Sequence, residues 1–200
     1  MPKVFPPGEE FDGLTFENQE YKKSIIQNRL FYNCLFKSCM MVECSLLDCS
    51  FFDCVFEKCD LSLAKLECSQ IRNTSFKESR LVGIDWTKLK WRKSPIQSST
   101  HFIQCNLSYS NFFGCMLKSS QMVECLAQET DFAEADLSKA NCLKTDFYKA
   151  RFFHTNLTEA DLTQALNYDI NAANNTLKKT RFSLPEAVAL LHSLDIILEE

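Results

Sequence analysis

The chain has 200 residues, a formal net charge of −4 and a pI of about 5.5. This length suits one sizeable domain or at most two small ones. A mildly acidic chain is not expected to bind nucleic acid directly through its charge. Hydrophobic residues make up 46% of the sequence, but no run of about 18 apolar residues occurs, so we predict no membrane span.

The first ten residues, MPKVFPPGEE, form a lead-in. They lack the apolar core of a secretory signal, so we expect the protein to reside in the cytoplasm. Eleven cysteines occur in the chain. Their odd number, their regular spacing and the missing signal favour reduced thiols over a disulfide framework.

A five-residue repeat begins at Phe11 and runs to Trp86, with a large apolar residue at every fifth position. A period of five fits neither a helix nor a strand. Five residues cannot bury an apolar side alone, so successive units must stack. Four phenylalanines recur at intervals of twenty residues, which predicts a coil with four sides: Phe16, Phe36, Phe56 and Phe76.

The position two places before each large residue is small from residue 34 onward, and it opens with six cysteines: Cys34, Cys39, Cys44, Cys49, Cys54 and Cys59. We predict that these cysteines pack inside the coil as small apolar residues. Metal ligation needs converging side chains, whereas residues five apart lie on adjacent walls. Stacked Cα atoms roughly 4.8 Å apart would permit a disulfide, but parallel side chains in a reducing compartment argue against it. Cys68 falls at a position of the repeat whose side chain points out of the coil, so it is expected to be exposed. We predict no metal site and no cofactor.

The repeat is interrupted at about residues 87–100, TKLKWRKSPIQSST. The candidate partner-binding residues of this loop are Lys88, Lys90, Trp91, Arg92 and Lys93. Loops on rigid scaffolds often carry function, and arginine with tryptophan is typical of binding sites. A connector that absorbs a change of register is equally compatible with the sequence. Trp91 still falls at a position of the repeat that carries a large apolar residue, so it could belong to the core.

The repeat resumes at Phe102, one residue out of phase, and continues to about residue 182. Aspartate or asparagine now often stands between the small and the large residue. The core prediction is that Phe36, Phe56, Phe132 and Phe152 are buried.

The segment 183–200 follows the repeats. Ser183, Pro185 and Glu186 have the spacing of a capping box, which predicts a short α-helix from Ser183 to about Leu194. Such a helix could cap the last coil, since an open stack needs a cover at its end. Its apolar residues exceed what one coil can bury, so we predict a homodimer through this segment. The candidate interface residues are Leu184, Val188, Leu191, Leu194, Ile197 and Leu198.

The motif resembles the pentapeptide-repeat family, whose pattern is Ala–Asp/Asn–Leu/Phe–x–x. FAEADLSKANCLKTDFYKARFFHTNLTEADL, residues 132–162, is close to this pattern, whereas the first block has cysteine in place of alanine. The resemblance covers roughly residues 11–182. It implies an all-β fold, a right-handed quadrilateral β-helix.

The stretches NYDIN and RFSLPEAVALLHSLDI are similar to the C-terminal part of family members that protect DNA gyrase from poisons. GIDWTKLKW, residues 83–91, and MVEC, residues 122–125, resemble most the members of this branch that give self-resistance to albicidin. The resemblance implies a DNA-shaped homodimer that binds DNA gyrase or topoisomerase IV and relieves inhibition by albicidin- or quinolone-type compounds.

An enzyme is not expected, because no glycine-rich phosphate loop, HExxH motif or nucleophile elbow is present in the sequence. The net charge of the protein is a poor match to the charge of a DNA duplex of the same length. A dimer of about 80 Å would replace duplex carrying roughly 47 charges, whereas two chains of −4 carry −8. Shape and specific contacts would have to do more than overall charge. A structural scaffold with an unrelated partner stays open as the alternative.

Overall fold

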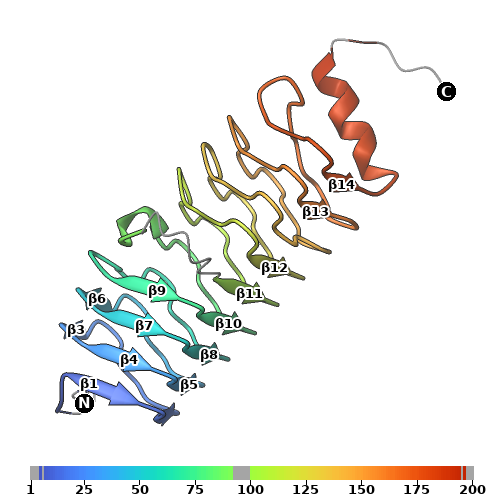
Figure 1. Ribbon diagram of the computed structural model, residues 1–200. Helices are drawn as coiled ribbons and strands as arrows, with labels where there is room; N and C mark the ends of the chain where they lie inside the picture. Colours follow the sequence, from blue (N-terminus) through green and yellow to red (C-terminus); the bar gives the residue numbers. More distant parts are fainter. Residues whose placement is uncertain (1–4, 6, 92–99, 195, 197–200) are drawn as a thin grey trace.

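The computed structural model describes residues 5, 7–91, 100–194 and 196. The chain winds into an elongated stack of about eight coils, with the amino terminus at one end and a helix at the other (Figure 1). Strands pair in parallel with strands of the next coil, as Phe16 with Phe36 and Phe36 with Phe56. The register of twenty residues confirms the predicted four-sided β-helix.

We number the four walls of the stack in the order in which the chain meets them. Wall 1 carries β1 (Glu10–Asp12), β4 (Leu30–Tyr32), β7 (Ser50–Phe52) and β9 (Gln70–Arg72). Wall 2 carries β2 (Thr15–Glu17), β5 (Leu35–Lys37), β8 (Val55–Glu57), β10 (Ser75–Lys77), β11 (His101–Ile103) and β12 (Gln121–Val123). The same wall ends with β13 (Asp161–Leu162) and β14 (Arg181–Phe182).

Walls 3 and 4 are held mainly by isolated β-bridges. Wall 3 runs as bridges from Glu20 to Leu166. Wall 4 begins with β3 (Ile25–Gln27) and β6 (Ser45–Leu47) and continues as bridges to Arg151. Each unit thus places one large residue inside and its two neighbours outside, because side chains alternate along an extended segment.

The interior is filled by the large apolar residues at every fifth position, as the sequence predicts. Phe36, Phe56, Phe132 and Phe152 are at most 6% exposed. Equivalent rings stack from one coil to the next: the ring centroids of Phe36 and Phe56 are 4.5 Å apart with an interplanar angle of 5°. Phe36, Phe56 and Phe132 each stack on a ring of the coil before and of the coil after, whereas Phe152, among the described rings, stacks on Phe132 alone.

The small column lines the corners of the interior. All eleven cysteines are free thiols and all except Cys68 are buried, which confirms the packing role. Many of these small side chains also donate a hydrogen bond to the coil before: Cys39 Sγ to the carbonyl of Phe16 at 3.1 Å and Ser69 Oγ to the carbonyl of Leu46 at 2.7 Å. Cysteine, serine and threonine can make this bond, whereas alanine only fits the space.

The outer corners are residues in the left-handed conformation, with φ between 48° and 62° at non-glycine positions. This conformation costs roughly 1–2 kcal/mol per residue when a Cβ is present. At Lys139 the backbone N–H donates to the carbonyl of Thr158 in the next coil at 2.8 Å, and other corners repeat this bond. Gly83 occupies one of these corners with φ of 69°, and a Cβ there would lie 2.7 Å from Leu63 Cδ2, so the exposed Leu63 side chain would have to shift.

The interruption begins after the 3₁₀ helix η1 (Trp86–Lys88). Ser75 pairs with Val55 on one side and with His101 on the other, so the register widens there from 20 to 26 residues. The walls nevertheless continue straight across the break, because Arg80 still bridges to Asn106 and Asp85 to Asn111.

The two ends of the stack are closed differently. At the amino end the ring of Phe5 lies 5.0–5.6 Å from four core rings: Phe11, Phe16, Tyr21 and Phe31. At the carboxy end lies η2 (Glu186–Leu194). None of the helices in the described ranges combines the length and the hydropathy needed to cross a bilayer.

The predicted C-terminal α-helix is wrong in type and in starting point. The helix is a 3₁₀ helix that begins at Glu186, and the Val188 N–H donates to the carbonyl of Pro185 three residues earlier. Ser183 does not cap it through its side chain. Its hydroxyl instead accepts the N–H of Gln164 in the preceding coil at 2.8 Å, so the capping group is used to join the last coils.

Candidate partner-binding surfaces

Residues 88–91, which enter the interruption and which we call the leg, are hydrogen-bonded to the preceding coil. The N–H of Cys68 donates to the carbonyl of Lys88 at 3.0 Å, and the N–H of Lys90 donates to the carbonyl of Ser69 at 2.8 Å. These two bonds continue the backbone pairing of the preceding coil up to residue 90. Arg92 and Lys93 of the candidate loop lie outside the described residues.

The side chains of this leg also have partners within the chain. Trp91 is partly buried against the core, and its Nε1–H donates to the carbonyl of Trp86 at 2.9 Å. Lys90 Nζ lies 2.9 Å from Asp48 Oδ1, and Lys88 Nζ lies 3.7 Å from Asp85 Oδ2. Three of the five candidate loop residues therefore hold the connection in place, whether or not they also contact a partner.

The C-terminal segment presents apolar side chains to solvent while being tied to the last coil. Ser193 Oγ accepts the N–H of Ala172 at 3.1 Å, and Ala189 and Leu190 pack against the core. Four of the candidate dimer residues are exposed: Leu184, Val188, Leu191 and Leu194. Ile197 and Leu198 lie outside the described residues. The arrangement leaves an apolar surface at the end of the rod.

Some of the charged side chains form ion pairs between stacked coils. Lys37 lies 3.3 Å from Glu17, Lys139 lies 3.6 Å from Glu159, and other pairs have the same separation of twenty residues. The remaining pairs of this kind are Lys23–Glu43, Lys58–Glu78, Arg80–Asp60, Lys144–Glu124, Arg151–Asp131 and Arg181–Asp161. Because each acid has a base one coil away, these acids cannot act as a row of unscreened negative charges.

The buried thiols differ in their surroundings: hydrogen bonds with Cys59 and Cys125 lower the pKa of the Cys39 and Cys105 thiols, whereas burial dominates at most of the others. Burial raises the pKa of the Cys44 and Cys142 thiols to about 12, so both stay protonated at neutral pH. In the described part of the chain, no three His, Cys, Asp or Glu side chains gather in a group that could hold a metal ion. Burial inside the coil is thus the property that all of these cysteines except Cys68 share.

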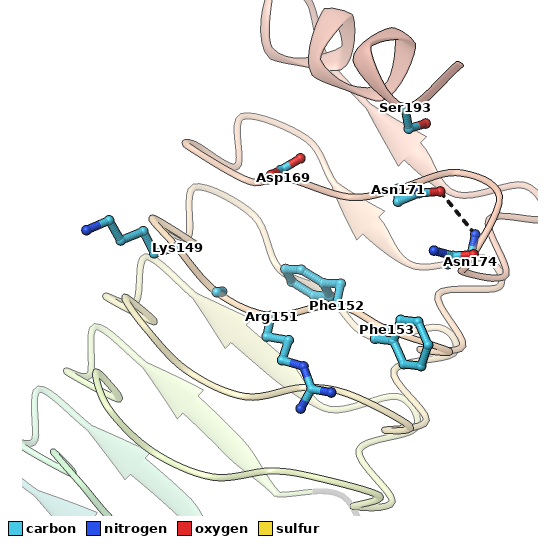
Figure 2. Close-up of a pocket in the computed structure, with 9 residues that line it drawn as sticks. Lys149, Arg151, Phe152, Phe153, Asp169, Asn171, Asn174 and Ser193 are labelled. Atoms are coloured by element: carbon cyan, nitrogen blue, oxygen red, sulfur yellow. Dashed lines mark hydrogen bonds between the residues drawn. The ribbon is translucent and has the colours of Figure 1, made fainter. Parts of the chain in front are cut away.

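A notch of about 680 Å³ opens between the last regular coils and η2. Figure 2 shows Phe152 at its floor, Asp169 and Asn171 above, and the charged ends of Lys149 and Arg151 pointing away. The notch forms because the chain at 171–175 leaves the repeat. There the Asn175 side chain donates to the carbonyl of Phe152 at 3.2 Å and accepts the N–H of Thr155 at 2.9 Å.

The sequence analysis missed a group of exposed aromatic side chains in the second block. Tyr109, Phe113, Tyr148 and Phe153 all lie on walls 3 and 4 and are exposed. A signal was present in the sequence: the outward position after the large residue carries Phe113, Ala133 and Phe153 at intervals of twenty. Such a column is apolar although it faces outward.

The repeat pattern matches a known family. Residues 29–100 match the profile of the pentapeptide repeat region, and residues 117–152 and 128–164 match that of pentapeptide repeats in eight copies. Together these matches cover more than half of the chain, which therefore belongs to the pentapeptide-repeat family. No curated protein sequence matches the chain.

Solved structures share the fold over most of the chain. A trypsin-treated form of QnrB1, a plasmid-mediated fluoroquinolone resistance protein, has a TM-score of 0.71 at 21% identity, covering 96% of this chain and 92% of that one. Full-length QnrB1 has a TM-score of 0.53 at 20% identity, covering 94% and 100%. HetL of the cyanobacterium Nostoc has a TM-score of 0.50 at 14% identity, covering 86% and 84%. At these identities the likeness is one of fold.

Proposed function

We propose that this chain is a non-enzymatic resistance factor that binds DNA gyrase or topoisomerase IV and relieves inhibition by quinolone- or albicidin-type poisons. The observation that carries the proposal is the match of the whole β-helix to QnrB1, a fluoroquinolone resistance protein, over nearly the full length of both chains. The similarity of NYDIN, GIDWTKLKW and the final segment to gyrase-protecting members adds to it.

The shape of the molecule supports binding in a site built for a rod. About eight coils at the strand spacing of roughly 4.8 Å give a length of about 40 Å. A homodimer joined through Leu184, Val188, Leu191 and Leu194 would double this length to that of a short DNA segment. The coil-to-coil ion pairs mean that such a dimer resembles DNA in shape more than in charge. We place the protein in the cytoplasm, where its proposed target acts.

The test is a supercoiling assay with purified gyrase, relaxed plasmid and either a fluoroquinolone or albicidin. Increasing amounts of the protein should restore supercoiling in the presence of at least one poison. A decatenation assay with topoisomerase IV extends the comparison to the second enzyme. The absence of both gyrase binding and rescue with either poison would reject the proposal.

The alternative is an interaction scaffold with an unrelated partner. It is favoured by the observation that the same fold occurs in HetL, which is involved in the regulation of heterocyst differentiation. The two readings separate in the same assay, because a scaffold of this kind would leave poisoned gyrase unchanged.

A further inference from the structure

Walls 3 and 4 of the second block expose four aromatic side chains, which we call the aromatic face: Tyr109 (62% exposed), Phe113 (43%), Tyr148 (47%) and Phe153 (40%). Within the described part of walls 1 and 2 in this block, Met116 is the one exposed large apolar side chain. The apolar surface is therefore concentrated on one side of the rod. Exposed patches of this kind mark interaction sites more often than scattered single residues do.

Two of the rings stand in line along the rod. Phe113 and Phe153 stand in one column of wall 4, with Ala133 between them. Ala133 is fully buried although its column faces outward, because the neighbouring side chains cover it. Hydrogen bonds keep this column rigid: the Gly114 N–H donates to the carbonyl of Ala133 at 2.9 Å and the Glu134 N–H to that of Phe153 at 2.8 Å.

Two glutamates without side-chain partners in the described part of the chain are bonded through their backbone to residues of the aromatic face. Glu129 and Glu134 are exposed corner residues, and their side chains make no ion pair or hydrogen bond with any described residue. Their backbone N–H groups donate to the carbonyls of Tyr148 and Phe153, both at 2.8 Å. The backbone of each of these glutamates is thus held against the backbone of a residue with an exposed ring. Their side chains differ from those in the acid–base pairs that join stacked coils elsewhere, such as Lys139 with Glu159.

The balance of charge on walls 3 and 4 of this block is negative. Lys149 and Arg151 are the two cations there, and Arg151 pairs with a carboxylate at 3.0 Å. They share these walls with five carboxylates: Glu129, Asp131, Glu134, Asp146 and Asp169. A negative, aromatic surface attracts cations, which both the carboxylates and the faces of the rings can hold.

The chain itself shows that these rings accept cations. Lys149 Nζ lies 5.2 Å from the ring centre of Tyr148, and Arg151 Cζ lies 6.0 Å from that of Phe153. On wall 1, Arg72 Cζ lies 4.5 Å from the ring of Phe52. A guanidinium group suits such places best, because it is planar, always charged and stacks on aromatic faces.

We propose that the aromatic face, with Glu129 and Glu134, is a docking surface for a partner protein that presents a basic, arginine-bearing segment. Nucleic acid and anionic lipid would be repelled by the same carboxylates that attract arginine. A second copy placed on the same surface by twofold symmetry would bring the acids of both copies together. This inference concerns the surface of the chain and stands independently of the proposed function.

The notch offers room for one side chain of such a segment. It begins at Phe153, where the aromatic face ends, and Asp169 is exposed at its edge. In Figure 2 the charged ends of Lys149 and Arg151 point away from Phe152 and Asn171. An arginine side chain entering the notch would therefore meet Asp169 and asparagine oxygens without first displacing a cation.

The experiment uses the full chain and a blocked peptide of four Arg–Gly repeats, with Lys–Gly and Glu–Gly peptides of equal length as comparisons. We expect the arginine peptide to bind, the lysine peptide to bind several-fold more weakly since it stacks less well, and the glutamate peptide not to bind. Amide chemical shifts should change on walls 3 and 4 of the second block. Equal binding of the three peptides, or shift changes confined to other walls, would overturn the proposal.

Variants decide which side chains are responsible. Glu129→Gln with Glu134→Gln, and separately Tyr148→Ser with Phe153→Ser, should each weaken arginine-peptide binding about tenfold, because each removes two modest contacts. Glu57→Gln with Glu67→Gln removes two carboxylates of the first block and is the matched control, expected within about twofold of the parent chain. Circular dichroism and thermal unfolding confirm that each variant is folded. Unchanged affinity in both test variants would contradict the proposal, as would loss of self-association in the Tyr148/Phe153 variant.

Discussion

Lys90 Nζ and Asp48 Oδ1 lie 2.9 Å apart although the two residues are separated by two coils of the rod. The pair spans the corner occupied by Cys68 and ties the leg of the interruption to the first block. The hydrogen bond that Lys90 donates to the Asp48 carboxylate raises the pKa of Lys90. Both partners are about half exposed, so the bridge orients the leg more than it stabilises the fold.

We predict that Asp48→Asn and Lys90→Met weaken rescue of poisoned gyrase to a similar extent, with little change in thermal stability. The reason is that either change removes the side-chain bridge that orients the leg, although the backbone bonds to Cys68 and Ser69 remain. The supercoiling assay, read beside a thermal melt of each variant, makes the comparison. If Asp48→Asn rescues fully while Lys90→Met does not, Lys90 contacts the partner directly and the positioning role is wrong.

Phe56→Ala should lower the free energy of unfolding by roughly 3–5 kcal/mol, since it removes a fully enclosed ring and leaves a cavity. The ring of Phe56 stacks between those of Phe36 at 4.5 Å and Phe76 at 4.9 Å. Cys49→Ala is the control and should cost roughly 1 kcal/mol, for it loses a small side chain and one weak bond to the carbonyl of Ile26. Urea unfolding measures both. Equal effects would mean that the rings do not dominate the core.

The corner residue Gln164, with φ of 58°, tests the left-handed corners. Gln164→Gly should raise the free energy of unfolding by up to about 1 kcal/mol, because glycine adopts this conformation without strain. Gln164→Val should lower it by about 1 kcal/mol or more, because a β-branched residue is poorly suited to positive φ. Both backbones keep the N–H that Ser183 accepts. A destabilising glycine together with a neutral valine would show that the corner is not strained.

The apolar end of the rod predicts self-association. Leu191→Glu with Leu194→Glu should convert a dimer into monomers, because two charges placed in an apolar interface are costly to bury. Light scattering coupled to size exclusion gives the mass, and circular dichroism should show that the β-signal is kept. Leu63→Glu, at an exposed leucine far from this end, is the control and should remain dimeric. A parent chain that is monomeric at tens of micromolar would contradict the prediction.

Alkaline pH should destabilise the fold. Burial raises the pKa of Cys44 and Cys142 from an ordinary value near 9 to about 12. Above pH 9 the folded state therefore keeps protons that the unfolded chain releases. The contribution of these two thiols to the stability of the fold is complete below pH 9 and is lost as the pH rises toward 12. In urea unfolding with reductant from pH 7 to 10, Cys44→Ala with Cys142→Ala should flatten the decline above pH 9. Each thiol accounts for up to about 1.4 kcal/mol per pH unit. Cys68→Ala is the matched control, and an unchanged slope in the double variant would contradict the assignment.

The coil and its core could be predicted from the sequence because one period governs both. Phe56 is buried since it stands five residues from the next large residue and twenty from Phe36 and Phe76. Buried cysteines follow from the same column. Neither conclusion needs knowledge of distant contacts, because each coil packs on the one next to it.

The features that break the period could not be predicted in the same way. Ser183 has the spacing of a helix cap, but its hydroxyl is used by Gln164 one coil earlier. The exposed position of Phe113 depends on which side of the wall it faces. The ion pairs could have been predicted from the sequence, because Lys37 and Glu17 are oppositely charged residues at the repeat distance of twenty.

A register of twenty residues means that the length of the rod can change only in whole steps. Removing or adding one coil shifts the distance between the interruption and the C-terminal end by about 4.8 Å and leaves every wall aligned. Removing a single five-residue unit would instead turn all following residues onto the neighbouring wall. The distance between the aromatic face and the apolar end is therefore set in steps of one coil. Evolution can change this distance by adding or removing coils while the residues of both surfaces stay the same.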